Sequence, residues 1–167
     1  MGLSHAHSMS DIKTLNVRFG EHTTKVALGF YYTGWALVLA QQPDYESSNP
    51  LHATALTTRL SNNSPDLPFP PPNPQNSRWR FCMKTYSENE GVLQQLIAVG
   101  VLQTTSRDLQ SGPLVEVLLE QTQISYCCLQ CVNNDGPAGV QFEVPGEARL
   151  MRCSQCKIAR YCNVEVG

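Results

Sequence analysis

Hydrophobic and polar residues alternate in several short stretches of this chain. Apolar residues at positions 15, 17 and 19 alternate with polar ones in Thr14–Phe19, and residues 79–86 repeat the pattern. A period of two places every second side chain on the same face of a strand. Both stretches therefore predict β-strands with one buried face. Residues 114–119 (Leu-Val-Glu-Val-Leu-Leu) follow the breaker pair Gly112-Pro113 and predict a further strand.

Residues 25–41 are apolar at nearly every position, so periodicity does not distinguish a long bent strand, a hairpin and a buried helix. Their many aromatic and β-branched residues favour strand. The longest apolar part, residues 26–40, is 15 residues long and contains Gly29, Thr33 and Gly34. A membrane helix needs about 20, so we expect this stretch to be core and expect no membrane association. Residues 52–60 predict a short element whose type the sequence leaves open.

Residues 87–99 carry the clearest helical pattern. Ser87 and Glu90 have the spacing of a capping box, in which the two side chains satisfy main-chain N–H groups at a helix start. Gly100 stands where a helix commonly ends. An apolar stripe near the helical period of 3.6 residues lies between them and contains Val92, Leu93, Leu96, Ile97 and Val99.

These elements together predict a small α+β domain over residues 12–125, without a recognisable family. Residues 1–11 are small and polar, and we expect them to be disordered. Residues 61–78 hold six of the eleven prolines and predict an exposed loop. From residue 126 onward cysteine, glycine and turn residues dominate, which marks a second, Cys-rich segment at 126–167.

Two Cys-x-x-Cys pairs stand in the Cys-rich segment, Cys128/Cys131 and Cys153/Cys156, with 21 residues between them. Two thiolates three residues apart can reach the same metal ion, and a second pair completes the tetrahedron of a structural zinc site. A strand at residues 140–144 and the turn Pro145-Gly146 predict a β-hairpin that brings the pairs together. This arrangement is a zinc ribbon, and it leaves Cys162 free.

Cys82 lies in an apolar, strand-like stretch, so we expect it to be a core residue. Cys127 is either a packing residue or a spare ligand. The first 30 residues lack a basic segment followed by an apolar one, so no signal peptide is predicted. We therefore expect an intracellular protein with reduced thiols, not disulfides.

The stretch Cys153-Ser-Gln-Cys156-Lys-Ile-Ala-Arg-Tyr161-Cys162 resembles the middle of a MYND-type zinc finger. The five ligand positions that match the family are Cys128, Cys131, Cys153, Cys156 and Cys162. The resemblance covers about 35 residues. The sixth ligand would fall at position 166, which is Val166, so the resemblance implies a finger cut off after its fifth ligand.

The resemblance also implies a cross-brace of two zinc ions. Cys128, Cys131 and Cys162 would supply three ligands to the first ion. Cys153 and Cys156 would supply two to the second, which should be weak or empty. The cross-brace and the zinc ribbon remain open alternatives. MYND fingers bind proline-rich peptides, so the resemblance implies protein partners, with an incomplete peptide groove in this chain.

A formal net charge of −2 gives no electrostatic footprint for nucleic acid, and we expect no direct binding to it. No catalytic motif is present, so we expect a zinc-binding interaction protein, not an enzyme. The alternative is an enzyme or ligand-binding domain at residues 12–125 with an accessory finger. Residues 126–167 hold few large apolar side chains, so we expect zinc removal to unfold that segment alone.

Overall fold

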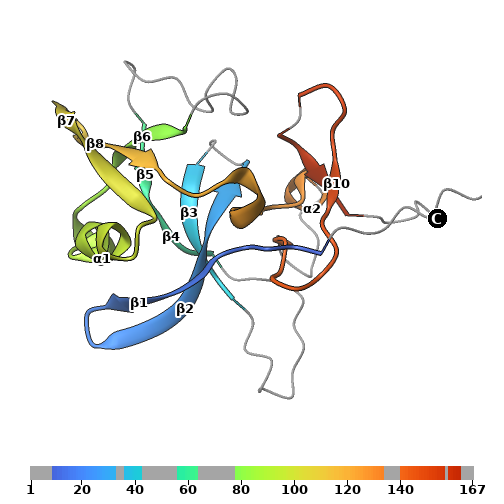
Figure 1. Ribbon diagram of the computed structural model, residues 1–167, viewed down its shortest axis with the longest axis horizontal. Coiled ribbons are helices and arrows are strands. Elements are labelled where there is room, and N and C mark those ends of the chain that lie inside the picture. Colours follow the sequence, from blue (N-terminus) through green and yellow to red (C-terminus); the bar gives the residue numbers. More distant parts are fainter. Residues whose placement is uncertain are drawn as a thin grey trace, which may run out of the picture.

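The computed structural model describes residues 9–32, 36–42, 56–63, 78–133, 140–156 and 158–162. These residues are mostly strand, with a few short helices, which agrees with the broad α+β class expected from the sequence. Figure 1 shows α1 (Val92–Ala98) and the hairpin of β7 (Leu102–Leu109) and β8 (Gly112–Val117) at one end of the molecule. The C-terminal segment lies at the other end. No helix among these residues is long and apolar enough to cross a bilayer.

The first sheet is built on a long antiparallel hairpin. β2 (His22–Tyr31) pairs with β1 (Thr14–Phe19) along its first half and with β3 (Ala36–Gln41) along its second half. β4 (Leu56–Arg59) extends the sheet beyond β3. The described parts of the apolar stretch 25–41 thus pair antiparallel, as in the hairpin that was one of the three forms its sequence allowed. Its near-continuous apolar pattern arises because β3 is buried on both faces.

The second sheet has the order β5-β6-β8-β7. The chain enters it at Leu60, whose N–H donates to the first sheet at Leu37 and whose carbonyl accepts from Lys84. The strands are β5 (Ser61–Asn62), β6 (Arg80–Met83), β7 (Leu102–Leu109) and β8 (Gly112–Val117). The predicted strands at 79–86 and 114–119 correspond to β6 and β8. β7 is an edge strand of mainly polar residues, and the sequence pattern did not indicate it.

The helix predicted at 87–99 is shorter than expected. Ser87–Asn89 forms a 3-10 turn with Ser87 at a positive φ of 57°, and α1 spans Val92–Ala98 after Gly91. The prediction that Ser87 caps this helix is therefore wrong. Its end agrees with expectation: Gly100 has φ 73°, and the N–H of Val101 donates to the carbonyl of Leu96, the bond that closes a Schellman motif.

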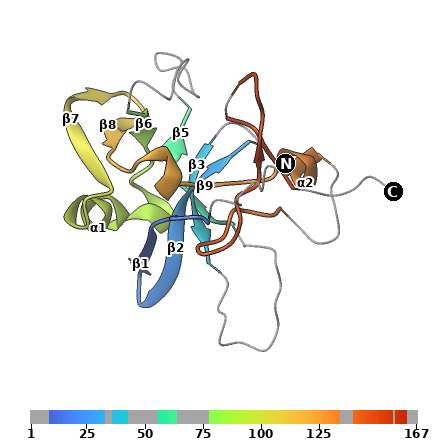
Figure 2. The ribbon, with the colours of Figure 1, turned by 45° about the vertical axis from the view of Figure 1, so that its right-hand side comes forward.

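The C-terminal segment attaches to the first sheet through main-chain bonds. After the 3-10 turn Gln121–Gln123, β9 (Ser125–Tyr126) runs parallel to β2, with Ser125 opposite Gly29 and Tyr126 opposite Phe30. The boundary expected between residues 125 and 126 thus falls inside a strand. Two residues, Cys127 and Cys128, separate β9 from α2 (Leu129–Asn133). Figure 2 shows β9 leading from the sheet towards α2.

The hairpin expected between residues 140 and 152 does not form, which corrects the sequence prediction. Phe142 instead bridges Cys127, and the short strand β10 (Met151–Arg152) pairs with β11 (Arg160–Tyr161). The turn at Pro145-Gly146 is present, with Gly146 at φ 78°. Residues 141–143 instead bond to the main chain of residues 126–128, and Phe142 is buried against the first sheet.

One hydrophobic core serves both sheets, α1 and the C-terminal segment. Phe30, Phe81 and Leu96 are fully or almost fully buried in it. The same cluster contains Tyr126, Cys127, Phe142 and Ala159 from the C-terminal segment. Met9, from the segment expected to be disordered, bridges Ala148; residues 1–8 lie outside the described part. Most of the proline-rich stretch also lies outside it.

Candidate metal centre

Three cysteine thiols come together where the C-terminal segment leaves the sheet. The sulfur atoms of Cys128, Cys131 and Cys162 all lie within 4.8 Å of one another, and those of Cys131 and Cys162 are 3.9 Å apart. Zinc–sulfur bonds of about 2.3 Å at tetrahedral angles would place two sulfur atoms about 3.8 Å apart. The three thiols therefore have the spacing of three corners of a tetrahedral metal site.

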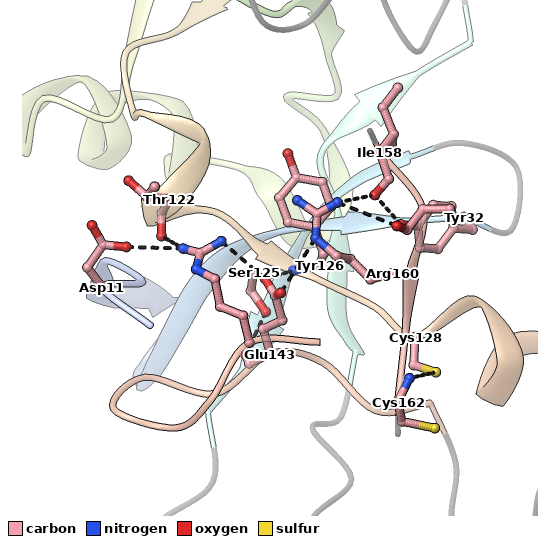
Figure 3. A network of polar contacts seen from close by, with 12 residues as sticks. Asp11, Tyr32, Thr122, Ser125, Tyr126, Cys128, Glu143, Ile158, Arg160 and Cys162 are labelled. Carbon is pink, nitrogen blue, oxygen red and sulfur yellow. Dashed lines mark hydrogen bonds and ion pairs between the residues drawn. The ribbon is translucent and has the colours of Figure 1, made fainter. Parts of the chain in front are cut away.

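Two segments of main chain position the three thiols. Cys128 lies two residues beyond β9 and is fully buried. Cys131 lies three residues later in α2, whose first turn is closed by the bond from Val132 N–H to the carbonyl of Cys128. Residues three apart on a helix lie on the same face. Cys162 follows β11, and its N–H donates to the sulfur of Cys128 at 3.1 Å (Figure 3).

The pKa values of the three thiols shift in different directions. Burial raises the pKa of Cys128, but the main-chain N–H groups of Cys131 and Cys162 stabilise its thiolate, and the net pKa is lowered. Burial and the neighbouring Cys128 raise the pKa of Cys131 to about 12, and the same two causes raise that of Cys162. Cys128 therefore loses its proton more readily than the other two cysteines, and binding a metal cation would displace the protons that the thiols still carry.

The second Cys-x-x-Cys pair lies outside this group. Cys153 is half-buried and Cys156 is exposed. They flank a tight turn in which the N–H of Cys153 donates to the carbonyl of Ala159 and the N–H of Ala159 donates to the sulfur of Cys156, at 3.3 Å. Among the described residues, the thiols that meet are those that the cross-brace gives to the first ion, and not the four of the zinc ribbon.

The two remaining cysteines are packing residues. Cys82 is almost fully buried in β6, as expected. Cys127 is fully buried, and its sulfur accepts the N–H of Tyr32 at 3.4 Å. Burial raises the pKa of Cys127 to about 12. The side chain of Cys127 belongs to the hydrophobic core and lies outside the cluster formed by the thiols of Cys128, Cys131 and Cys162. This placement favours packing over the role of spare ligand.

The donor set fits a metal ion in kind and is one ligand short of a complete structural zinc site. Three cysteine sulfurs suit zinc, and structural zinc sites use four protein ligands. The described residues therefore supply all but one of the ligands of such a site. No family model, curated protein or solved structure matches the chain, so the function must be argued from this site.

Proposed function

We propose that this protein binds zinc through Cys128, Cys131 and Cys162 and acts as an interaction module with a MYND-type finger. The observation that carries the proposal is the convergence of three thiols within 4.8 Å of one another from two segments that lie about 30 residues apart in the sequence. Buried free cysteines usually behave as isolated hydrophobic side chains. A cluster with sulfur spacing close to a tetrahedral edge is more typical of a metal site.

The order of the ligands supports the finger over a zinc ribbon. In a cross-brace, the first pair of ligands and the fifth ligand share an ion, while the second pair is held apart. The described structure brings the fifth cysteine, Cys162, to the first pair and leaves Cys153 and Cys156 in their own turn. That turn already donates an N–H to a sulfur, which would help to hold a thiolate for a second ion.

Cobalt substitution tests the ligand set. Co²⁺ bound to thiolates absorbs in the near ultraviolet, with an intensity that grows with the number of thiolates. We expect the chain to bind about one equivalent tightly and Cys131→Ser or Cys162→Ser to weaken binding strongly. Cys156→Ser is the matched control because its thiol is exposed and outside the group. Loss of binding in Cys156→Ser, with Cys162→Ser unaffected, would favour the zinc ribbon instead.

The interaction role rests on the family resemblance, and it predicts a partner with a proline-rich segment. A fluorescent Pro-x-Leu-x-Pro peptide titrated against the zinc-loaded chain measures this directly. Weak binding that disappears in Cys131→Ser would support a groove shaped by zinc. Identical binding by both proteins would show that the peptide site does not depend on the thiol group.

A further inference from the structure

A short piece of main chain connects the first sheet to the cluster of three thiols (Cys128, Cys131 and Cys162). Tyr126 pairs with β2, the N–H of Cys127 donates to the carbonyl of Phe30 at 3.1 Å, and the N–H of Cys128 donates to Gln141 at 2.7 Å. Cys128 is therefore held by the sheet two residues beyond β9. Cys162 arrives from a distant part of the sequence and needs a separate anchor.

A buried arginine lies two residues before Cys162. The side chain of Arg160 is 4% exposed, and its guanidinium carbon lies 4.1 Å from the centre of the Tyr126 ring. Its Nε lies 3.6 Å from a carboxylate oxygen of Glu143, whose side chain is fully buried. Figure 3 shows the guanidinium between Tyr126 and Glu143, directed away from the two labelled cysteines.

Partners on the sheet side hold this ion pair in a fixed geometry. The other carboxylate oxygen of Glu143 accepts the N–H of Tyr126 at 3.3 Å and lies 3.8 Å from Arg149. The hydroxyl of Ser125 donates to the carbonyl of Glu143 at 2.8 Å. Arg149 also donates to the carbonyl of Thr122 and pairs with Asp11 at 3.1 Å. Glu143 is thus fixed to β9 through both its main chain and its side chain.

The same arginine fixes the chain that leads to the third cysteine. Its guanidinium donates to the carbonyl of Ile158 at 2.7 Å, and the hydroxyl of Tyr32 donates to that carbonyl at the same distance. Arg160 also forms a parallel bridge with Cys128. Its contacts therefore set the position of residues 158–160 along residues 126–128.

Burying a guanidinium and a carboxylate is a poor way to gain stability. Removing two charges from water costs free energy, and apolar residues of similar volume often stabilise a fold as well or better. A buried ion pair is best known for fixing the register of one segment on another. Here a change of register along residues 126–128 would move Cys162 away from Cys128 and Cys131.

We propose that Arg160, paired with Glu143, is a positioning residue that sets the register of residues 158–162 and so delivers the Cys162 thiol to the metal ion. This role rests on the proposed zinc site. The coupling is reciprocal because linkage acts in both directions. Zinc held by the three thiols stabilises the Arg160–Glu143 contact and, through Tyr126, the pairing of β9 with β2.

Zinc affinity, measured by competition with a chelator, tests the role of Arg160. We expect Arg160→Gln and Glu143→Gln to weaken binding about 10–100-fold, as loss of a residue that orients a metal ligand usually does. Arg160→Lys keeps the charge but lacks the planar, multiply donating guanidinium, so its affinity should lie in between. Arg152→Gln is the matched control, because Arg152 stands opposite Arg160 in the β10–β11 pair and is exposed.

The Co²⁺ spectrum separates positioning from general destabilisation. If Arg160→Gln releases Cys162, its thiolate-to-cobalt band should match the reduced band of Cys162→Ser. A full three-thiolate band with the affinity of Arg152→Gln would overturn the proposal while leaving the zinc site intact. Failure of the unaltered chain to bind either metal would instead overturn the zinc site itself.

Hydrogen exchange on the unaltered chain gives a second test that does not require a variant to fold. Zinc should slow amide exchange at Tyr126, Cys127 and Glu143. Their N–H groups donate to the carboxylate of Glu143, the carbonyl of Phe30 and the carbonyl of Tyr126, respectively. Slowing confined to residues 128–133 and 158–162 would overturn the proposed coupling to the sheet.

Discussion

Phe142 offers the sharpest test of whether the C-terminal segment belongs to the same folding unit as the sheet. Its side chain is 3% exposed, and its ring stacks on Tyr31 with centroids 6.2 Å apart. It also covers Gly29 of β2, where an added Cβ would lie 3.1 Å from the ring. Replacing Phe142 with alanine would remove this ring while leaving every cysteine in place.

The expected loss of stability follows from the buried area. A buried aromatic side chain removes roughly 150–250 Å² from water, which is worth about 4–6 kcal/mol at about 25 cal/mol per Å². Buried Phe→Ala changes in proteins cost about 3–5 kcal/mol. We therefore expect Phe142→Ala to lower the free energy of unfolding by about 3–5 kcal/mol. Domains have only about 5–15 kcal/mol in total, so Phe142→Leu provides a milder variant.

Urea unfolding followed by the fluorescence of the two tryptophans measures this loss. Trp79 is suited to the purpose because it is buried and lies 6.2 Å from the Tyr126 ring. Tyr86→Ala is the matched control, since that aromatic ring is 57% exposed and its loss should change stability by less than about 0.5 kcal/mol. A change below about 1 kcal/mol in Phe142→Ala would refute the shared core.

A double-mutant cycle makes the same test independent of the absolute value. Gly29→Ala alone should cost about 1–3 kcal/mol, because the new methyl group meets the Phe142 ring and the side chain of Val38. With Phe142 already reduced to alanine, part of that space is open and the cost should shrink or vanish. Strictly additive costs would mean that the ring does not lie on β2.

Three further predictions concern other parts of the chain. Gly112→Ala should destabilise the second sheet by at least about 1–3 kcal/mol, because Gly112 has φ 134° and a Cβ there would meet a main-chain carbonyl of β6. Gly20→Ala, at φ 59° in open space, should cost less, and thermal melts of the two variants measure the difference. A hydrogen bond from Lys84 lowers the pKa of Glu88. The stabilising effect of this bond should be present above about pH 4 and lost as the pH falls through that lowered pKa. Glu88→Gln should make the free energy of unfolding, measured by urea titration, less dependent on pH in this range, and an unchanged dependence would contradict the assignment. Alkylation of the metal-free protein, followed by mass spectrometry, should label the exposed Cys156 quickly and the buried Cys127 only on unfolding. Burial also raises the pKa of Cys127 to about 12, which disfavours its reactive thiolate. Early labelling of Cys127 would contradict its packing.

Local sequence patterns predicted the strands whose two faces differ. β1 was recognisable because Leu15 and Val17 are buried between exposed polar residues. β7 was not, since only Leu102 is buried in a strand of polar residues at the edge of its sheet. The false cap at Ser87 has a similar cause: the capping-box spacing was present, but tertiary contacts placed Asn89 in a buried position and moved the helix start to Val92.

The sequence predicted the members of the candidate site but left two groupings open. Cysteine spacing and the resemblance to a MYND-type finger gave Cys128, Cys131 and Cys162 among five candidates, and the pairing of the chain segments decides which thiols meet. That pairing depends on Phe142 and Arg160 finding places against the sheet. A lone Glu143 in the stretch Val140–Val144 and the arginine of Ala-Arg-Tyr-Cys carry no local signal of burial. Only the folded chain shows that they form an ion pair.

The shared core changes what zinc removal should do. Composition suggested that residues 12–125 fold alone and that only the Cys-rich segment needs metal. In the structure, however, Phe142 and Ala159 complete the core of the first sheet, and β9 crosses the expected boundary. A ligand that binds only the folded state stabilises it by about 2.7 kcal/mol at 100 times its dissociation constant. Tyr126 and Phe142 link the segment that carries the three thiols to the first sheet. The stabilisation by zinc is therefore not confined to residues 126–167.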